Sequence, residues 1–494
     1  MKKEKQMTAP PGADASFNQP RDWKAIDWTA IREQVRRLQM RIAKATQSGH
    51  HRKAQSLQWL LTHSWAAKLL AVQTVTSNKG AKTPGVDNVI WRTDKQKLHA
   101  AINLKRHGYK PSPLRRHYIP KSNGKLRPLS IPTMRDRAMQ ALYALALAPI
   151  AETLADPNSY GFRLGRGCAD ALAKCHNVLS TQRAPKWVLE GDIRACFDEI
   201  SHEWLLQNIP MDKQMLQKWL KAGYREEGQL FPTPKGTPQG GIISPILANL
   251  TLDGMEQVVR AAVRKRGDKV NFVRYADDFV VTGATRELLE QKVKPAVTAF
   301  LKARGLELSE QKTVITHIQD GFNFLGHTVR KYKEILLTTP AKSRVQELQT
   351  KIKQTIQSCL GLSQEALIRK LNPLLRGWAN YFRNAASKRA FSAMDKYLFQ
   401  QIWQWAKRRH PAKSAGWKRR KYFSAFGPGW NFSVRIRLAE DKSRVLKLYR
   451  MVHTKIERHI KVRSAANPYD PVYSDYFEKR RCFAWRVMNS SSAH

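Results

Sequence analysis

One stretch constrains the fold more than any other, NFVRYADDFVVTG from Asn271 to Gly283. Its valine, phenylalanine and tyrosine residues favour a β-strand, whereas aspartate disfavours one, yet Asp277 and Asp278 stand in the middle of the run. Neighbouring side chains of a strand point to opposite faces, so two adjacent carboxylates can share one ion only at a turn. The pattern predicts a hairpin with both aspartates at its tip. For this pair taken alone, solvated turn aspartates are the alternative.

The chain is strongly basic. Its 87 Lys and Arg residues against 39 Asp and Glu give a formal net charge of +48. This excess indicates a polyanionic partner, and nucleic acid leads because each neutralised phosphate releases counterions. A ribosome-associated protein and a merely solvated basic surface are the alternatives. With 494 residues, 42% of them hydrophobic, the chain is long enough for about two to four structural units.

Several classes of protein are disfavoured. The five cysteines include no C-x-x-C pair, which argues against a zinc ribbon and against a disulfide framework. No run of about 18 apolar residues is present, so no membrane span or membrane partner is expected. The N-terminal segment lacks the apolar region of a secretory signal. We expect a cytoplasmic, nucleoid-associated protein of bacterial type.

Helical periodicity marks both ends of the chain. A helix is expected from Asp22 onward, a second one across Leu57 to Leu69, and a third over the run RDRAMQALYALALAPIAE, ending near Pro149. From about residue 340 the pattern changes, and three apolar stripes at helical spacing predict a separate helical module. The stripes cover residues 345–360, 367–382 and 391–405.

The middle of the chain mixes short strands and helices. HYIPKSNGKLRPLSIP predicts a hairpin around Ser122-Asn123-Gly124, and KWVLEGDI predicts a strand that leads into Asp192. Asp192 is therefore the natural third carboxylate beside Asp277 and Asp278. Nucleotidyl transfer uses two divalent ions about 3.5–4 Å apart, bridged by carboxylates. Mg²⁺ suits this chemistry because it prefers oxygen ligands and keeps positions for phosphates.

A basic segment lies inside the helical module. Residues 383–421 contain twelve Lys or Arg and one acidic residue, Asp395, with Trp403, Trp405 and Trp417 interleaved. Basic side chains neutralise phosphates, and aromatic rings stack on unpaired bases. We expect most of these aromatics to belong to the core and the basic face to contact RNA. A solvated basic face is the alternative.

Taken in order, the motifs resemble those of a reverse transcriptase, specifically the group II intron-encoded kind that is also a maturase. The resemblance implies an α+β fold, a right-hand polymerase with fingers and palm and an α-helical thumb or maturase domain. The similar stretches between Lys79 and Phe432 are KGAKTPGVD, HYIPKSNGKLRPLSIPTMRDRAMQ, YGFRLGRGCADAL, LEGDIRACFDEISH, GTPQGGIISPILANLTLDGME, RYADDFVV, GLELSEQKTVITH, FNFLGHTV and PLLRGWANYF.

The resemblance also implies a division into regions. These are an N-terminal helical extension, 1–78, the reverse transcriptase fingers and palm, 79–335, the thumb or maturase (X) domain, 336–445, and a basic C-terminal segment, 446–494. The last is expected to bind DNA or to be a truncated endonuclease linker. Many relatives continue after an ANPYDP-like stretch into an endonuclease, whose metal ligands we do not find here, so no endonuclease activity is expected. His453 and His459 are expected in a basic patch rather than as ligands.

Catalytic roles follow from the resemblance residue by residue. Asp192 and Asp277 are the expected principal Mg²⁺ ligands of a two-metal site, with the backbone carbonyl of Ile193 as an extra ligand. Asp278 completes the catalytic carboxylates, with less direct metal contact. Asp277 is expected to be indispensable.

The resemblance assigns six substrate-binding residues. Lys121 and Arg127 match the fingers residues that grip the incoming triphosphate, and opposite charge fits that role. The alternative is a charged hairpin turn. Phe197 matches the position beside the nucleotide ribose, where bulk excludes a 2′-hydroxyl group, with an ordinary core phenylalanine as the alternative.

The other three substrate residues lie further along the chain. Gln239 is expected beside the templating pair, or else simply in a helix-entry loop. Tyr275 is expected to support primer or template, or to be a packing aromatic. Lys312 matches a lysine that protonates the leaving pyrophosphate, and a plain surface lysine is the alternative.

These features predict an RNA-directed DNA polymerase and splicing maturase. It would bind a group II intron RNA, assist its splicing and copy it into DNA during retrohoming, with dNTPs, a primer-template and target DNA as further partners. Priming would use nascent strands at replication forks or other available 3′ ends. The alternatives are a domesticated reverse transcriptase in DNA repair or phage defence, and a polymerase-inactive RNA-binding splicing factor. The sequence leaves monomer and dimer open.

Overall fold

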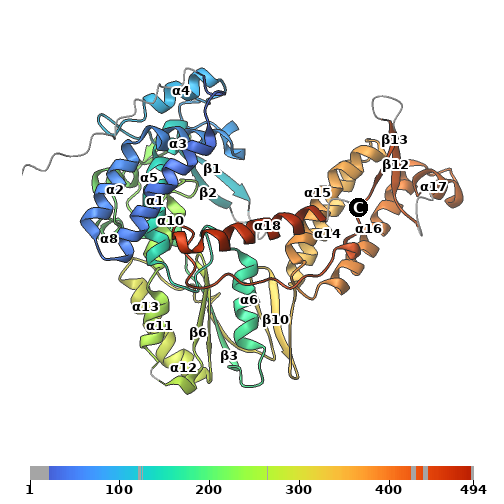
Figure 1. Cartoon of the computed structure of the whole chain (residues 1–494). Coiled ribbons are helices and arrows are strands. Elements are labelled where there is room, and N and C mark those ends of the chain that lie inside the picture. The colour runs from blue at the N-terminus through green and yellow to red at the C-terminus, as the bar shows by residue number, and fades with distance from the viewer. Residues whose placement is uncertain are drawn as a thin grey trace, which may run out of the picture. The chain divides into compact units, whose positions relative to one another are not determined.

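Two compact units make up the chain, and they alternate along the sequence. The first comprises Met1–Thr153 and His202–Leu247, and the second comprises Leu154–Ser201 and Ala248–His494. Helices and β-sheets are mixed along the chain, as expected for the α+β class (Figure 1). The computed structural model describes residues 22–120, 124, 126–263, 265–423, 430–437 and 443–490.

The first unit combines helices with a sheet of strand order β2-β1-β4-β5. β1 and β2 form the antiparallel hairpin that the sequence predicts, with Ile119 opposite Arg127. Helix α10 (Ser244–Leu252) contains the boundary with the second unit. The elements of the first unit are α1 (Trp28–Gln47), α2 (His51–His63), α3 (Trp65–Thr76), α4 (Asp94–Ile102), β1 (Leu114–Pro120), β2 (Leu126–Ile131), α5 (Met134–Leu154), α8 (His202–Asn208), α9 (Lys213–Leu220), β4 (Tyr224–Glu226) and β5 (Gln229–Phe231).

The single helix expected across Leu57 to Leu69 is wrong, because the chain breaks it at Ser64. This residue has ψ 132°, an extended conformation, and separates α2 from α3. Its carbonyl already accepts a hydrogen bond from the Lys68 N–H at 3.2 Å, so Ser64 is the N-cap of α3. Serine is among the residues that favour this position.

The expected helix end near Pro149 is also wrong, since α5 continues to Leu154. Proline lacks the N–H that would bond the carbonyl four residues earlier. Here that carbonyl belongs to Leu145, and it accepts a hydrogen bond from Gln39 Nε2 at 2.8 Å. The side chain from α1 thus satisfies the group that the proline leaves open, and the helix persists for another turn.

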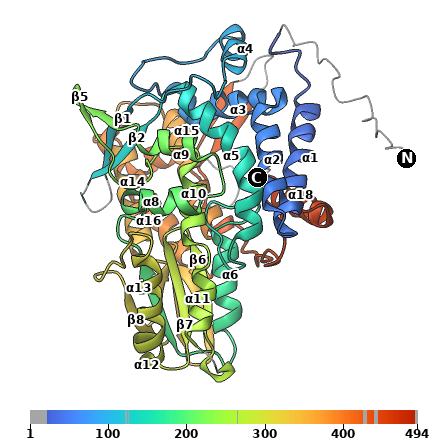
Figure 2. The same cartoon turned by 90° about the vertical axis from the view of Figure 1, so that its left-hand side faces the viewer.

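The second unit is built on an antiparallel sheet with strand order β6-β7-β3-β8. Val188 and Val280 face α6 in one apolar cluster with Cys175 and Leu179. Helices α11 and α13 lie beside each other (Figures 1 and 2). The elements are α6 (Cys168–Leu179), β3 (Trp187–Asp192), α7 (Cys196–Glu199), α11 (Met255–Ala261), β6 (Asn271–Tyr275), β7 (Asp278–Gly283), α12 (Arg286–Leu288), α13 (Lys294–Lys302), β8 (Val314–His317), β9 (Phe322–Phe324), β10 (His327–Tyr332) and β11 (Ile335–Pro340).

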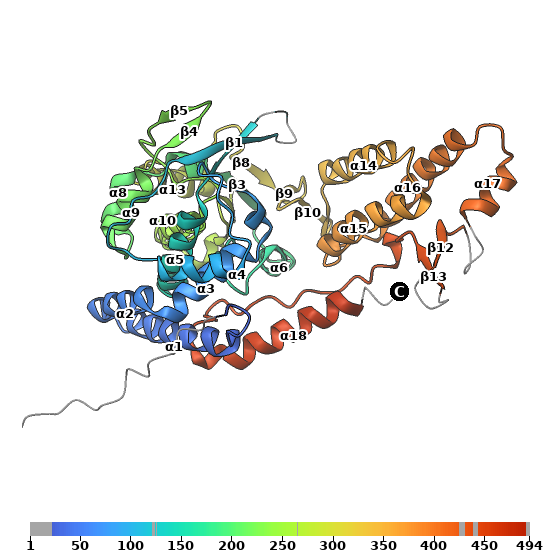
Figure 3. The same cartoon turned by 90° about the horizontal axis from the view of Figure 1, so that it is seen from above.

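The helices predicted after about residue 340 are confirmed, and they belong to the same compact unit as the sheet. The three apolar stripes become α14 (Lys342–Gln357), α15 (Gln364–Phe382) and α16 (Lys388–Arg409), which pack on one another (Figure 3). Trp405 is buried in their core, as expected for most aromatics of the basic segment. The module continues with α17 (Ala415–Tyr422) and the pair β12 (Ser433–Arg437) and β13 (Ser443–Lys447).

The C-terminal segment folds back onto the second unit and ends in α18 (Ser474–Ser490). Asp170, in the first turn of α6, receives the Val462 N–H at 2.6 Å and Arg480 Nη2 at 3.1 Å, and His459 Nε2 lies 2.9 Å from the same carboxylate. Burial alone raises the pKa of Asp170, but these contacts prevail and hold it below the ordinary value. His459 is thus paired with a buried acid.

No helix in the described ranges is long and apolar enough to cross a membrane. The five cysteines are unpaired, which agrees with the absence of a disulfide framework expected from their spacing.

We predict that Asp170→Asn loosens the C-terminal segment. Removing one partner of a buried charged pair costs about 3 kcal/mol or more, because the other charge stays buried. Limited proteolysis should then cut residues 455–482 faster than in the parent protein, and the melting temperature should fall. Asp475→Asn, the same change at an exposed position of α18, is the control and should leave both measurements unchanged. Equal proteolysis of Asp170→Asn and the parent would contradict the anchoring role.

Candidate active site

The hairpin of β6 and β7 has both aspartates at its tip, as the sequence pattern predicts. β6 ends at Tyr275 and β7 begins at Asp278, and these two residues lie opposite each other. Only Ala276 and Asp277 connect the strands. Ala276 has φ 57°, in the left-handed region that residues with a Cβ rarely adopt. This tight turn sets where Asp277 lies relative to Asp278.

Asp192 and Asp278 are brought together by the register of β3 and β7, which places them directly opposite each other. Directly paired residues of an antiparallel sheet lie on the same face, and like charges there are destabilising. Burial, and then the negative charges of Asp277 and Asp192, raise the pKa of Asp278 to about 7. The three acids therefore form one zone of concentrated negative charge.

Lys312 forms an ion pair with this zone. Its ammonium Nζ lies 3.0 Å from Asp192 Oδ2, while the lysine side chain itself is 67% exposed. The charge of Lys312 also opposes the rise in the pKa of Asp278. An exposed lysine on a flexible stem is free to exchange this carboxylate for a phosphate group.

Ile193, the expected backbone ligand, lies at the end of β3 and is buried. The strand end is held on both sides of it. The Ser309 N–H donates to the Asp192 carbonyl at 2.8 Å, and the Arg194 N–H donates to the Glu307 carbonyl at 2.9 Å. These bonds fix the backbone that presents the Asp192 side chain.

The carboxylate oxygens at this site suit a divalent cation that is bound partly by the protein and partly by substrate phosphates. Across the described part of the chain, no three His, Cys, Asp or Glu side chains form a ready-made metal cage. Mg²⁺ is usually bound instead through one or two carboxylates together with substrate phosphates. The Asp192–Asp278 pair offers two carboxylates, and burial, followed by the charges of the neighbouring acids, raises the pKa of Asp278 despite the opposing charge of Lys312.

Arg274, which sequence reasoning missed, lies fully buried on the other face of the sheet, because side chains alternate along β6. Its guanidinium donates to the Ala276 carbonyl at 3.3 Å and to Asn249 Oδ1 at 3.2 Å, and it forms an ion pair with buried Asp253. Burial raises the pKa of Asp253 to about 7, and Arg274 opposes that rise. Arg274 therefore ties the turn that positions Asp277 to α10.

Gly161 is the second missed residue. A Cβ atom at this position would overlap the backbone of Ala276, so the loop can approach the hairpin tip only through a glycine. The Gly161 carbonyl accepts a hydrogen bond from Asn249 Nδ2 at 2.9 Å, and Asn249 also bonds Arg274. The YGF motif marks this loop in the sequence, but its contact with the hairpin required the fold.

The aromatic candidates differ in their surroundings. Phe197, in α7, is half-buried, and its ring lies 6.2 Å from that of Phe162, which is 52% exposed. Tyr275 packs against the apolar cluster beneath α6. Burial, followed by the contact with Cys168, raises the pKa of the Tyr275 hydroxyl to about 12. Tyr275 thus has the environment of a packing aromatic.

The remaining candidates belong to the first unit. Arg127 is exposed on β2, and Lys121 lies outside the described residues. The Gln239 carbonyl accepts the Ser130 N–H at 2.7 Å, which fixes its loop on β2. Gly240 has φ 117°, and a Cβ there would lie 2.8 Å from the Ser130 carbonyl oxygen, so the close approach requires glycine.

Paired carboxylates on an antiparallel sheet, followed along the chain by a helical module, agree with a nucleic-acid polymerase of the reverse transcriptase class. Family models agree with this classification. The model described as reverse transcriptase (RNA-dependent DNA polymerase) matches residues 119–329, and the N-terminal domain of reverse transcriptase matches residues 23–104. The group II intron, maturase-specific domain matches residues 345–423.

Curated relatives identify the family more closely. Protein YkfC of Escherichia coli K12 is 33% identical over 338 residues, which cover 59% of this chain and 87% of YkfC. The group II intron-encoded protein LtrA of Lactococcus lactis is 33% identical over 53% of this chain and 54% of LtrA. An uncharacterized 91 kDa protein in the cob intron of Schizosaccharomyces pombe is 26% identical over 73% of this chain and 54% of that protein.

The chain belongs to the family of group II intron-encoded reverse transcriptases and maturases. It spans about half the length of LtrA and of the cob intron protein. The family, the fold and the RNA-directed DNA polymerase class that the motifs predicted are confirmed.

We predict that Arg274→Lys lowers the turnover rate by about 10- to 100-fold, because a small misplacement of catalytic groups costs about that much. Lysine keeps a positive charge beside Asp253 but loses the fork that also reaches the Ala276 carbonyl. The measurement is steady-state primer extension, with kcat and KM determined separately and RNA affinity measured in parallel. KM and RNA affinity should stay near the parent values.

Arg260→Lys is the matched control, since that guanidinium is 62% exposed and bonds Glu256 rather than Asp253 or the Ala276 carbonyl. It should extend primers at the parental rate. A parental kcat for Arg274→Lys in a protein of unchanged melting temperature would refute the positioning role.

Proposed function

We propose that Asp192, Asp277 and Asp278 support Mg²⁺-dependent DNA synthesis on an RNA template. The observation that supports this most directly is the cross-strand pairing of Asp192 with Asp278 next to the Asp277 turn. When bound, a pair of Mg²⁺ ions activates the attacking 3′-oxygen and stabilises the leaving pyrophosphate. Asp192 and Asp277 are the proposed principal ligands, with Ile193 contributing its carbonyl and Asp278 in less direct contact.

Other residues are proposed to bind and orient the substrates. Lys121 and Arg127 grip the triphosphate of the incoming dNTP, and Phe197 lies beside its ribose. Gln239 contacts the templating pair. Lys312 exchanges Asp192 for the departing pyrophosphate, a role that agrees with its ion pair and its exposed side chain. Tyr275, the last residue of β6, packs against the apolar cluster that supports the hairpin, and the hairpin receives the primer.

We further propose that the chain binds a group II intron RNA, assists its splicing and copies it into target DNA in retrohoming. The net charge of +48 supports a nucleic-acid partner. We also propose the division into regions that the motifs imply. The regions are an extension at 1–78, fingers and palm at 79–335, a thumb at 336–445 and a C-terminal segment at 446–494. In the C-terminal segment, exposed basic side chains of α18 that do not contact Asp170, such as Lys479, are proposed to bind DNA.

A domesticated role in DNA repair or phage defence uses the same chemistry. Similarity to LtrA, which is named as intron-encoded, favours the intron role over this alternative. Sequencing the DNA around the gene discriminates between them, since the intron role requires a group II intron RNA enclosing the reading frame. A polymerase-inactive splicing factor is disfavoured because all three acids are present.

We predict that Asp277→Asn lowers the rate of oligo(dT) extension on poly(rA) at least about 1,000-fold, because a lost metal ligand removes several kcal/mol of transition-state stabilisation. RNA affinity should change little. Asp320→Asn, an exposed aspartate after β8, is the control and should extend primers like the parent. Chelation of Mg²⁺ should abolish extension by the parent. Unimpaired extension by Asp277→Asn would refute the assignment of the metal site.

We predict that RNA affinity falls steeply with salt and that the basic face of α16 contributes to the slope. Each phosphate contacted on a single strand adds about 0.7 to the log–log slope. Lys407→Gln with Arg408→Gln should therefore reduce it by about 1.4, measured by fluorescence anisotropy between 50 and 300 mM salt, roughly the range over which screening changes most. Lys292→Gln with Lys302→Gln is the charge-matched control outside the basic segment. A salt-independent affinity would contradict an electrostatic interface.

A further inference from the structure

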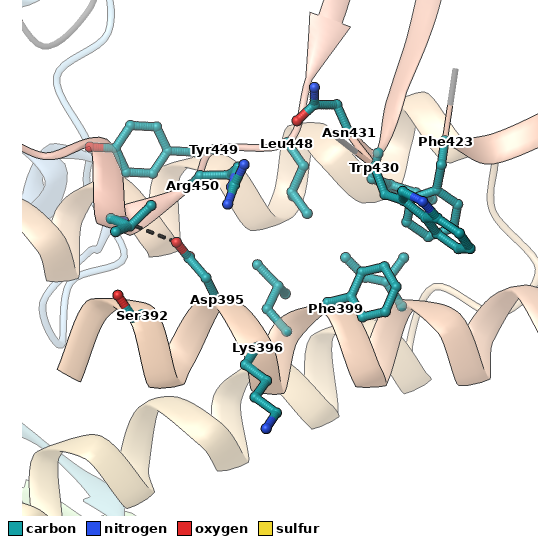
Figure 4. Close-up of a pocket in the computed structure, with 14 residues that line it drawn as sticks. Ser392, Asp395, Lys396, Phe399, Phe423, Trp430, Asn431, Leu448, Tyr449 and Arg450 are labelled. Carbon is teal, nitrogen blue, oxygen red and sulfur yellow. Dashed lines mark hydrogen bonds between the residues drawn. The ribbon is translucent and has the colours of Figure 1, made fainter. Parts of the chain in front are cut away.

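A cavity of about 430 Å³ opens in the helical module, away from the paired acids of the palm sheet. We call it the aromatic pocket. It lies between α16 and the two segments that flank β12 and β13 (Figure 4). Its volume falls within the range of about 300–1,000 Å³ that is usual for small-molecule sites. The residues used below are Asp395, Lys396, Phe399, Phe423, Trp430 and Arg450.

One end of the aromatic pocket is lined by the rings of Phe399, Phe423 and Trp430, which form a cluster of four with the ring of Trp403. Every pair of these rings is in contact, with centroids 5.6–6.4 Å apart. Phe423 is buried, but Phe399 and Trp430 remain 38% and 43% exposed. Neighbouring exposed aromatics of this size usually mark a binding surface.

The other end of the pocket is polar and rigid. Asp395 accepts the Met451 and Val452 N–H groups, each at 2.9 Å, which fixes the segment after β13 against α16. Burial raises the pKa of the Asp395 carboxyl, and these two backbone bonds oppose that rise. The one acid of the basic segment is therefore engaged in holding the wall of the pocket.

Two cations lie beside the pocket. Arg450 lines it and is exposed, and the guanidinium of Arg419 lies 4.6 Å from the centre of the Trp430 ring. Lys396 also lines the pocket, but its ammonium points away from the cavity (Figure 4). Aromatic faces with adjacent positive charge are the two elements of single-strand recognition, since the rings stack on a base and the cations neutralise its phosphates. An apolar protein segment would satisfy the rings but would leave the cations without partners.

We propose that the aromatic pocket binds one unpaired nucleotide of a single-stranded RNA, with its base stacked on Trp430 and in contact with Phe399, and its phosphates beside Arg419 and Arg450. This inference rests on the RNA binding proposed above. It adds a site that distinguishes single-stranded from duplex RNA, because a paired base has no free face to offer. The function of the pocket is to hold an unstacked loop or strand end of the bound RNA.

The test compares Trp430→Ala and Trp430→Tyr with the parent, using a 12-nucleotide single-stranded RNA that contains one 2-aminopurine and a blunt duplex of the same sequence. Loss of one base–aromatic stack lowers affinity by about 5- to 100-fold. Trp430→Ala should show this loss for the single strand and none for the duplex. Trp430→Tyr should restore most of the affinity. The salt slope should be unchanged, since stacking releases no counterions.

Trp59→Ala is the matched control, because Trp59 is also exposed, at 60%, and lies on α2 outside the module. It should bind both RNAs like the parent. In the parent, binding should change the fluorescence of 2-aminopurine through stacking, and Trp430→Ala should lose that change.

Two results would overturn the proposal. One is equal affinity of Trp430→Ala and the parent for the single strand, as expected if the pocket receives an apolar protein segment. The other is an equal loss for single strand and duplex at an unchanged melting temperature, which would make the site a general phosphate contact. If Trp430→Ala melts early, Phe399→Leu provides the same comparison. Failure of the parent to bind either RNA would instead overturn the RNA binding proposed above.

Discussion

The register of β3 and β7 holds two acidic side chains close together, and the rest of the second unit has to accommodate their repulsion. The pairing of β3 with β7 leaves Asp192 opposite Asp278, and burial deepens the repulsion between them. Such an arrangement persists only when the surrounding backbone is over-determined. The bonds around Ile193 fix one strand end, and Arg274 fixes the opposite turn. The fold thus maintains a local electrostatic cost that a divalent cation can offset.

Basic side chains of this protein have different roles, depending on whether they are buried or exposed. Arg274 is buried and compensates Asp253, so its role is to hold structure. Lys312 is exposed and pairs with a single carboxylate, so it can exchange partners. Arg419, beside the aromatic pocket, is exposed to solvent and lies over the Trp430 ring. A net charge of +48 therefore describes a partner class but not the location of any site.

Local patterns predicted much of the fold, and tertiary contacts explain what they missed. The apolar stripes predicted α14, α15 and α16. The three aspartates were proposed as one set because the motifs that contain them follow the order of the family along the chain. The helix break at Ser64 and the continuation of α5 through Pro149 were not predicted. The continuation was missed because Gln39, from a distant helix, satisfies the Leu145 carbonyl that the proline leaves open. Arg274 reads as an ordinary strand arginine, and Trp430 as one more aromatic, until folding brings their partners from other segments.

The loop that begins at Gly161 is confined at two points. At Gly161 it touches the hairpin tip, and at Gly165 a Cβ would lie 2.7 Å from the Phe477 ring of α18. The contact with the hairpin turn and the contact with the last described helix thus lie only four positions apart along the chain. The same short loop packs against the hairpin turn at one glycine and against α18 at another. A ligand that displaces α18 would therefore alter packing close to the turn that carries Asp277.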